Sequence, residues 1–552
     1  MIPSSAKDIG GQRKLVYLLL GLLAALIICV VLMAAVPPVS RDALTHHLAV
    51  PKLYLQHGGI HEIPDLKYAY YPMNLDLLYL LALYFKNDIL PKYIHFTFAL
   101  FTGLLLYRYL NQRIDRRYAL FGVLSFLSVP VIVKLSITVY VDLGLIFFST
   151  AALLFFFKWL DSECDLKHLL IAAVFCGLAL GTKYNGLLVL LLLALFTPYA
   201  YMRLHSADQA AGVKALGYSA VFVLTALLVF SPWMIRNYVW TNNPLFPLYD
   251  AFFNPDAPYH AIPLKPFVER RLIYHESWLQ IALVPIRIFF QGQDNNPQYF
   301  DGQLNPFLLL LPLFAFGREA NDRPNNMLER QLLAAFAILY ILYAFFTRDM
   351  RVRYIAPALP ALVLLAMYGL RNLFALAAKI GQDSARWAAR ALISATLIGM
   401  ILLNSHYIYE QFQHVGPWRY IIGKVDRDAY IQKYRPEYAS LQYINNHLAD
   451  DARLLALFIG RRSYYCDREM VFGIELLKDI VQTAASAMEI RDAMARSGFT
   501  HVIVGRRLYE KWQRDTFNAE ERSRLDDFWQ AHTVLIHRQA GYELYRLEKK
   551  TA

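Results

Sequence analysis

Long apolar runs, separated by short charged loops, recur along most of this chain and limit its possible folds more than any other feature. The first run, "LVYLLLGLLAALIICVVLMAAV" at residues 15–36, reaches the ~20 apolar residues that a helix needs to cross a bilayer. It is too long for the core of a signal peptide and no small-residue cleavage site follows it, so we expect it to remain as the first span. Because 57% of the 552 residues are hydrophobic and 18% are charged, we predict a polytopic α-helical membrane protein.

Hydropathy and loop charge together predict about eleven transmembrane helices. The expected spans are residues 15–36, 91–110, 116–133, 138–158, 166–182, 184–201, 212–235, 304–317, 329–347, 352–373 and 389–409. Basic residues gather in alternate loops, such as "YRYLNQRIDRRY" around Arg113, and the positive-inside rule places these loops and the N-terminus in the cytoplasm. The run "PMNLDLLYLLALYF" from Pro72 is short for a span and contains Asp76, so we expect a helix on the outer membrane surface.

The predicted topology divides the chain into two domains. Residues 1–410 form a transmembrane domain with long outer loops at 37–90 and 236–303, and residues 411–552 form a small soluble domain outside the membrane. In that domain "ARLLALFIG", "MVFG" and "THVIVG" have the pattern of buried strands, whereas "SLQYINNHLA", "AMEIRDAMARSG" and "AEERSRLDDFWQAH" have helical periodicity. This alternation predicts an α/β domain. The chain has no phosphate-binding glycine loop, which argues against an ATP-driven pump.

Two acidic residues fall at predicted outer ends of spans. Asp42 in "SRDALTHHLAV" follows the first span, and on a helix capped by Ser40 it would share a face with His46. Asp142 in "KLSITVYVDLGLIFFST" begins another span, where an acid is costly unless it is paired or functional. The alternatives are an ordinary acid in the first turn of an interfacial helix for Asp42 and a marker of the water boundary for Asp142. The predicted topology puts both acids at one depth, so they could form one site.

Basic residues occur at the same predicted level, against the positive-inside bias. They are Lys183 in "LALGTKYNGLL", Arg236 in "SPWMIRNYVWTNNPLFP", and Arg348, Arg351 and Arg353 in "TRDMRVRYIAPALP". An anionic lipid headgroup would explain them, because Arg binds phosphate oxygens in bidentate fashion and Lys offers a point charge. Snorkelling side chains at span ends are the alternative.

Cysteine and metal chemistry contribute little to the prediction. Of Cys29, Cys164, Cys176 and Cys466 only the last is expected outside, so neither a disulfide framework nor a paired-cysteine zinc site is available. A metal site on Asp42, His46 and His47 is disfavoured because adjacent histidines on a helix point apart. We therefore expect no cofactor; a divalent metal is possible but not indicated.

The order of several motifs resembles the GT-C superfamily of membrane glycosyltransferases, over roughly residues 15–410. Within it, the chain is most similar to relatives of the protein O-mannosyltransferases and of lipid A aminoarabinose transferase. The motifs, in order, are "RDALTHHLAVPKLYL", "YYPMNLDLLYLL", "VYVDLGL", "GTKYNGLL", "PWMIRNYVWTNNPLFP" and "RVRYIAPALP".

The resemblance implies transfer of a sugar from a polyprenyl-phosphate donor to a glycan, lipid or protein acceptor at the outer face of the cytoplasmic membrane. It implies that Asp42 is the catalytic base or orients the acceptor, and that Asp142 assists. A direct displacement would invert the anomeric configuration. Our candidates for the donor phosphate are the basic residues Lys183, Arg236, Arg351 and Arg353, and those for acceptor or sugar are His46, Tyr71 and Asn74. We expect a bacterial inner membrane, with an archaeal membrane as the alternative.

Two other functions remain open at this point. A transporter or flippase for a lipid-linked sugar also needs many spans and membrane-embedded charges, but it is expected to show repeated halves and polar residues near the bilayer midplane. The candidates here gather at span ends instead. A non-catalytic membrane binding protein would keep the same scaffold without the chemistry.

Overall fold

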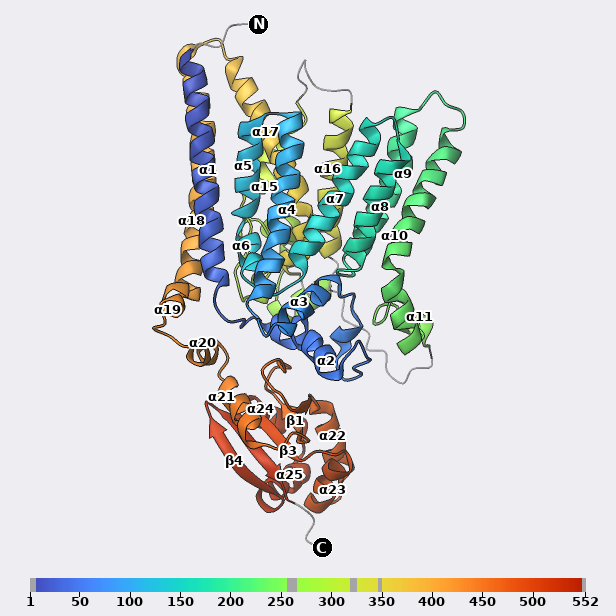
Figure 1. Cartoon of the computed structure of the whole chain (residues 1–552), viewed down its shortest axis with the longest axis vertical. Coiled ribbons are helices and arrows are strands. Elements are labelled where there is room, and N and C mark those ends of the chain that lie inside the picture. Colours follow the sequence, from blue (N-terminus) through green and yellow to red (C-terminus); the bar gives the residue numbers. More distant parts are fainter. Residues whose placement is uncertain (1–5, 256–265, 318–324, 346–349, 549–552) are drawn as a thin grey trace. The chain divides into compact units, whose positions relative to one another are not determined.

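The computed structural model describes residues 6–255, 266–317, 325–345 and 350–548, and the chain divides into two compact units (Figure 1). The first unit comprises Met1–Ala35, Tyr70–Leu78 and Leu90–Pro417. The second comprises Val36–Ala69, Tyr79–Ile89 and Trp418–Ala552. Helix α3 (Asn74–Tyr84) contributes residues to both. The second unit therefore contains much of the first outer loop as well as the C-terminal residues.

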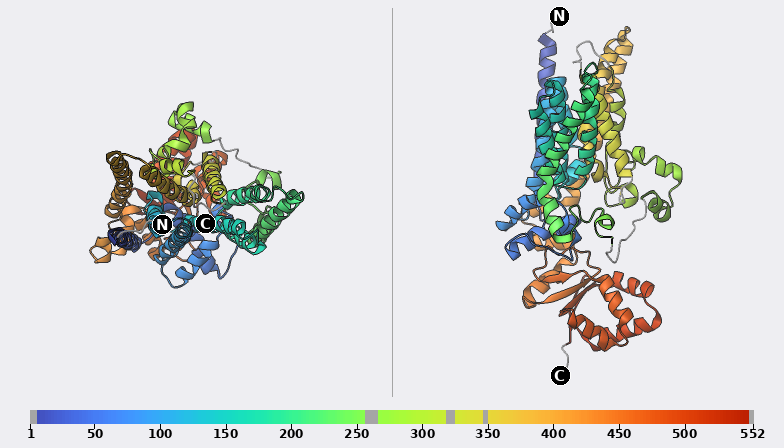
Figure 2. Two further views of the ribbon diagram at one scale, coloured as in Figure 1. Left: turned by 90° about the horizontal axis from the view of Figure 1, so that it is seen from above. Right: turned by 90° about the vertical axis from the view of Figure 1, so that its right-hand side faces the viewer.

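The first unit is a bundle of long helices. Its principal helices are α1 (Ala6–Ala34), α4 (Leu90–Arg113), α5 (Arg116–Leu127), α6 (Pro130–Ser136), α7 (Asp142–Asp161), α8 (Leu166–Leu180), α9 (Gly186–Leu204), α10 (Ala211–Thr241), α16 (Asn326–Phe345), α17 (Leu359–Ala378) and α18 (Asp383–Val415). Seen along its helices in Figure 2, the bundle has α8, α9 and α10 together on one side, and all three contact one another. The segment between α10 and α16 carries the short helices α11 (Asp250–Phe253), α12 (Pro266–Tyr274), α13 (Trp278–Ala282), α14 (Val284–Arg287) and α15 (Phe307–Leu310).

The apolar helices make this chain a membrane protein, as predicted. Within the described ranges, six helices are long and apolar enough to cross a membrane, and the broken pair α5–α6 makes a seventh if it counts as one span. All eleven predicted spans fall on helical segments of the bundle. The number of helices that actually cross remains a prediction.

Proline accounts for two departures from the predicted spans. Helices α5 and α6 meet at a bend of 66°, where Val129 before Pro130 has ψ 130°, because the proline ring disfavours helical backbone in the preceding residue. The predicted span 304–317 is instead the short α15 followed by a 3-10 turn, Leu311–Phe314, with Pro312 in it. A third departure is α10, which continues past Arg236 to Thr241, so that Arg236 lies inside the helix.

Helix α7 is the most enclosed of the spanning candidates. Of its apolar window 72% is buried, against 22% for α1, which is why its sequence is apolar around its whole circumference. Gly144 lets α3 approach closely, since a Cβ atom there would stand 2.5 Å from Cδ2 of Leu75. The first turn of α7 therefore lies among packed helices, and Asp142 lies there with it.

The second unit is built around a five-stranded sheet of order β2-β1-β3-β5-β4. The strands are β1 (Arg453–Leu457), β2 (Glu469–Val471), β3 (His501–Gly505), β4 (Thr533–Gln539) and β5 (Tyr542–Leu547). Strand β1 runs parallel to β2 and β3, and β5 runs antiparallel to β3 and β4. Alternate residues of β1 enter different cores: Leu455 and Leu457 pack with helices α22 (Ile474–Thr483), α23 (Ala487–Arg496), α24 (Arg506–Thr516) and α25 (Ala519–Ala531), whereas Leu454 and Ala456 pack with α21 (Tyr438–His447).

The predicted α/β domain is confirmed, and its three predicted strands correspond to β1, β2 and β3. The β4–β5 hairpin was not predicted. Its turn residues Ala540 and Gly541 both have positive φ, 51° and 81°, as a two-residue hairpin turn requires. Alanine is an unusual residue at such a position, so the sequence lacks the usual Asn-Gly or Asp-Gly signal.

The first outer loop is attached to the C-terminal residues within the second unit. Lys52 of α2 (Ala49–His57) donates to the carbonyls of Tyr464 and Cys466, each at 2.8 Å. The Tyr464 amide donates to the Leu44 carbonyl at 3.1 Å, and the Tyr465 hydroxyl donates to that of Pro38 at 2.8 Å. The loop that contains Asp42 therefore forms one body with the α/β domain.

The orientation of the chain can be tested by cysteine labelling. We predict that a maleimide added outside intact cells labels Lys424→Cys, just after the last long helix, and spares Gln112→Cys, because the basic loop beside Gln112 should be cytoplasmic. Both positions are exposed, and a background without the four native cysteines removes other targets. Labelling of Gln112→Cys alone would show that the chain has the opposite orientation in the membrane.

Candidate active site

A buried ion pair joins the start of α7 to the turn between α8 and α9. Lys183 Nζ lies 2.7 Å from Asp142 Oδ1, and the Asp142 side chain is only 2% exposed. Asp142 is the first residue of α7, where the helix dipole also favours a negative charge. A carboxylate this deeply buried needs a charged or hydrogen-bonding partner, and Lys183 supplies one.

Asn74 fixes the turn that carries Lys183. Its backbone amide donates to the Gly181 carbonyl at 2.9 Å, and its Nδ2 donates to the Leu178 carbonyl at 3.3 Å. Its Oδ1 accepts from Trp233 Nε1 at 2.8 Å. Gly181 must be glycine for this approach, since a Cβ there would stand 2.3 Å from Asn74 Nδ2. In the structure, then, this predicted sugar-binding residue connects the start of α3 to α8 and α10.

His95 holds the first turn of α7 and was not singled out from the sequence. Its Nδ1 lies 3.0 Å from the carbonyl oxygens of Leu135 and Thr138, and its Nε2 accepts from the Leu143 amide at 2.9 Å. Because carbonyl oxygens only accept, the network assigns the proton to Nδ1 and a neutral ring. A histidine within the apolar run "YIHFTFAL" was the available signal.

Arg353 adds a second cation beside Asp142. It attracts the Asp142 carboxylate electrostatically, and its guanidinium lies over the rings of Tyr140 and Tyr354, 5.1 and 5.2 Å from their centroids. Lys183 Nζ lies 5.2 Å from the centroid of the same Tyr354 ring. Two cations thus act on one carboxylate, Lys183 by direct contact and Arg353 electrostatically.

Arg351 belongs to a different charge cluster, although it is only two residues away. Its Nη1 lies 3.4 Å from Asp301 Oδ2, and Lys134 lies 3.5 Å from the same carboxyl group. Lys134 also pairs with Asp294 at 3.0 Å. The structure therefore brings Arg353 to Asp142 and Arg351 to Asp301, whereas Arg348 lies outside the described residues.

Arg236 positions the segment before α3. Its Nη2 donates to the carbonyls of Tyr70 and Tyr71 at 2.6 and 3.1 Å, and the guanidinium lies 4.6 and 4.9 Å from the rings of Trp233 and Trp240. The ring of Tyr71 meets that of Tyr184 edge-on, with centroids 5.7 Å apart. Arg236 therefore acts on this site through the backbone that presents Tyr71.

A cavity of about 850 Å³ opens beside Lys183 in the first unit. Its lining combines one lysine, several tyrosines and a set of leucines: Tyr71, Lys183, Tyr184, Asn185, Leu187, Leu188, Leu191, Leu245, Leu248, Tyr249, Tyr343 and Tyr354. Leu187, Leu188 and Leu191 come from the first turns of α9, directly after the turn that carries Lys183. A cation and hydroxyl groups joined to an apolar wall fit an amphiphile with an anionic head.

Asp42 and His46 lie in the second unit. Asp42 is half-buried and directly precedes a π-helical turn, Ala43–His47, closed by the Leu48 amide on the Ala43 carbonyl at 2.9 Å. The sequence predicted an ordinary α-helix here, with Asp42 and His46 on one face. That prediction used the spacing of an α-helix, and a π-helical turn has a different number of residues per turn. The His46 ring stacks on Tyr68 with centroids 4.6 Å apart. Single π-turns are frequent at functional sites.

Comparisons with known proteins concern the family model and the fold. Residues 79–235 match the family model described as dolichyl-phosphate-mannose-protein mannosyltransferase, a stretch that includes Asp142 and Lys183. ArnT from Cupriavidus metallidurans in the apo state is 13% identical with a TM-score of 0.58, covering 97% of this chain and 98% of that one. The same protein bound to undecaprenyl phosphate is 13% identical with a TM-score of 0.57, covering 95% and 97%. No curated protein sequence matches the chain.

A third similar structure is the oligosaccharyltransferase of Archaeoglobus fulgidus tethered to an acceptor peptide. It is 11% identical with a TM-score of 0.54, over 96% of this chain and 74% of that one. The fold of this chain is similar to the folds of both proteins. The resemblance to the GT-C superfamily, first indicated by the order of sequence motifs, is confirmed by this likeness of fold and by the family-model match.

The two neighbouring arginines provide a matched test of the site. We predict that Arg353→Gln weakens binding of polyprenyl phosphate to the purified protein by about tenfold to a hundredfold, the range expected when a charged hydrogen bond is lost. Arg351→Gln should have a smaller effect, because Arg351 pairs with Asp301. Normal elution from a sizing column would show that both variants fold. Equal losses of affinity for polyprenyl phosphate would place both arginines at the phosphate. If both variants kept the wild-type affinity, the result would favour snorkelling of the arginine side chains at span ends.

Proposed function

We propose that this protein transfers a glycosyl group from a polyprenyl-phosphate-linked sugar to an acceptor at the outer face of the cytoplasmic membrane. The observation that carries the proposal is the cavity that joins Lys183 to the leucines of α9 within a GT-C fold. An anionic phosphate beside Lys183 and an isoprenoid chain along the leucines would satisfy both parts of its lining. The similar structure of ArnT bound to undecaprenyl phosphate supports this class of lipid.

The proposed reaction is a single displacement. An acceptor hydroxyl attacks the anomeric carbon, Asp42 takes its proton, and the bond from that carbon to the phosphate oxygen breaks with its electron pair on the phosphate. Lys183 and Arg353 stabilise the negative charge that builds on the departing polyprenyl phosphate. Attack opposite the leaving group inverts the anomeric configuration.

Asp142 has a different proposed role from Asp42. Its carboxylate is held at 2.7 Å by the Lys183 ammonium and attracted by Arg353, so it is already neutralised by protein cations. We therefore propose that Asp142 assists by fixing Lys183 in position. Asn74 and Arg236 would act in the same way on the turn with Lys183 and on Tyr71.

The orientation and partners follow from the same proposal. The N-terminus would be cytoplasmic, the second unit would lie outside, and the membrane would be a bacterial inner membrane. The acceptor would be a glycan, a lipid or a protein. A flippase for the same lipid would use the same cavity but would form no glycosylated product, so radiolabelled transfer from a polyprenyl-phosphate donor separates the two functions.

Replacement of Asp42 tests the chemical step. We predict that Asp42→Asn lowers turnover by about 10²–10⁴, the usual contribution of a general base, while binding of polyprenyl phosphate is retained. Asp451→Asn, at an exposed acid of the same unit, is the matched control and should leave turnover unchanged. Asp42→Asn with wild-type turnover would remove Asp42 from the mechanism and leave it as an ordinary helix-start acid.

Asp142→Asn should be measured beside it. If Asp142 acts through Lys183, this variant weakens donor binding as well as turnover, which distinguishes it from Asp42→Asn. Losses in the double variant should then be non-additive, because both acids serve one reaction.

A further inference from the structure

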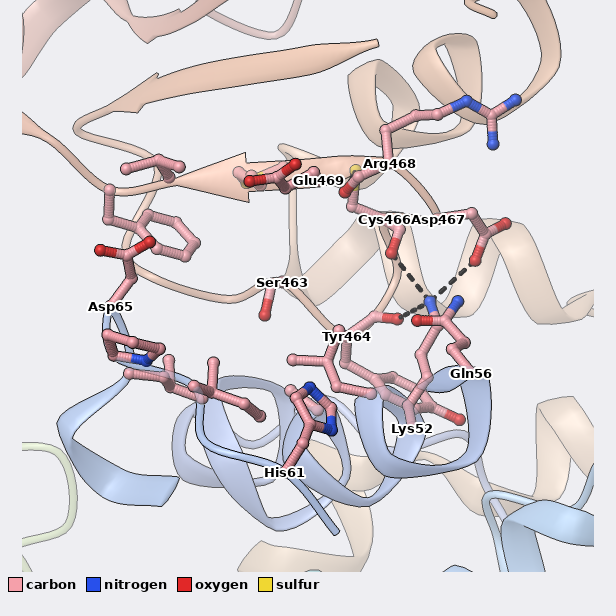
Figure 3. Close-up of a pocket in the computed structure, with 18 of the residues that line it drawn as sticks. Lys52, Gln56, His61, Asp65, Ser463, Tyr464, Cys466, Asp467, Arg468 and Glu469 are labelled. Atoms are coloured by element: carbon pink, nitrogen blue, oxygen red, sulfur yellow. Dashed lines mark hydrogen bonds and ion pairs between the residues drawn. The ribbon is translucent and has the colours of Figure 1, made fainter. Parts of the chain in front are cut away.

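The second unit has a cavity of its own, distinct from the one beside Lys183. Its volume is about 380 Å³, and it lies between α2 with its following loop and the segment 463–472 after β1. Figure 3 shows Ser463, His61 and Asp65 facing this space from different walls. None of the residue roles considered so far uses it.

Lys52 builds one wall of this cavity. Its ammonium donates to the carbonyls of Tyr464 and Cys466 at 2.8 Å and to Asp467 Oδ1 at 2.7 Å, as the dashed lines in Figure 3 mark. An ammonium group has three donors, and these contacts use all three. Lys52 therefore fixes the segment 464–467 and leaves no donor for an anion.

The loop that leads from β1 to the segment 463–472 has strained backbone. Phe458 and Arg461 have φ of 59° and 52°, conformations that non-glycine residues seldom adopt. Between them, Gly460 has φ 84°, and a Cβ there would stand 2.4 Å from Arg462 Nη1. Arg462 is anchored by an ion pair with Glu437. Such conformations persist where the surroundings over-determine them, and they cluster at ligand sites.

The remaining lining indicates the ligand class. The second cation, Arg468, is held by the carbonyls of Asn445 and Leu448 at 3.1 and 2.9 Å and by Asp450 at 2.9 Å. Both lining cations are thus bound by protein oxygens, so a phosphate or carboxylate ligand gains little here. The other polar side chains are hydroxyl, amide, imidazole and carboxylate groups, namely Ser463, Gln56, His61, Glu62, Asp65 and Glu469.

These groups suit a sugar. Carboxylates and amides accept hydrogen bonds from hydroxyl or ammonium groups, whereas Ile63, Met470 and Phe472 offer apolar surface to the C–H face of a ring. We infer that this cavity binds a neutral or amino-substituted sugar unit of the acceptor. The inference rests on the proposed function, and it narrows the acceptor to a glycan or glycolipid.

The connection to Asp42 is direct within this unit. Tyr464, which lines the cavity, donates its amide hydrogen to the Leu44 carbonyl at 3.1 Å. Leu44 belongs to the π-helical turn that begins directly after Asp42. A sugar bound in the cavity therefore places the acceptor in the same compact unit as the proposed base.

Filling the cavity tests this inference in the transfer reaction. Ser463→Phe should raise the KM for the acceptor about tenfold or more by occupying the sugar's space, with binding of polyprenyl phosphate unchanged. Met488→Phe, at an exposed position of α23 outside the cavity, is the matched control and should leave the KM unchanged. A wild-type KM in a folded Ser463→Phe protein would overturn the inference.

Alkylation of Ser463→Cys in the full-length protein tests binding without transfer. Methyl hexosides or glucosamine should slow its reaction with a maleimide, and glucose 6-phosphate should not; Met488→Cys, exposed on α23, should react equally with and without sugar. Protection by glucose 6-phosphate alone would indicate an anion site, and protection by a lysine-rich peptide alone would indicate a site for a basic peptide. Either result, or no protection by any probe, would contradict a sugar site. Protection without any transfer by the wild-type protein would keep the cavity's assignment and reject the proposed function instead.

Discussion

The ion pair between Lys183 and Asp142 is the interaction on which the first unit's site depends. A carboxylate that is 2% exposed at the start of an apolar helix is tolerable only with a close cation, and the α8–α9 turn places Lys183 at 2.7 Å. Asn74 holds that turn and His95 holds the first turn of α7. Arg353 attracts the same carboxylate electrostatically, and Lys183 lines the leucine-rich cavity beside it. In the proposed function, the cations that neutralise Asp142 are also those that bind the anionic headgroup.

The second unit uses charge differently. Lys52 uses its three donors on protein oxygens and Arg468 is held by two carbonyls and Asp450, so both cations serve to shape the cavity. In the proposed function the two units therefore divide the substrates by chemistry. The first provides cations and an apolar wall for a lipid phosphate, and the second provides Asp42 and a polar, neutral-to-acidic cavity for a sugar. Packing of the loop around Asp42 onto the α/β domain makes the base and the acceptor cavity parts of one body.

The sequence predicted features that depend on local pattern. Apolar runs located the helices, and buried-strand patterns located β1, β2 and β3. The carboxylate of Asp142 and the ammonium of Lys183 were expected at the same depth in the membrane, and the structure joins them in an ion pair. Features that depend on packing were not accessible: the π-turn after Asp42, the Asp301 partner of Arg351, the structural bonds of Asn74 and the turn at Ala540–Gly541. The cavity at Ser463 also escaped, because its walls come from segments about 400 residues apart that only the fold brings together.

The central claim is that the cavity beside Lys183 holds a polyprenyl phosphate, and photo-crosslinking tests it most directly. A polyprenyl phosphate with a photoreactive group on its first isoprene units would be bound to the purified full-length protein, irradiated, and the modified peptides identified by mass spectrometry. The account predicts labelling of the α9 segment with Leu187 and Leu191 and of the segment with Leu245 and Leu248, reduced by Arg353→Gln. Labelling spread over the outward-facing helix α1, with these segments unmodified, would contradict it.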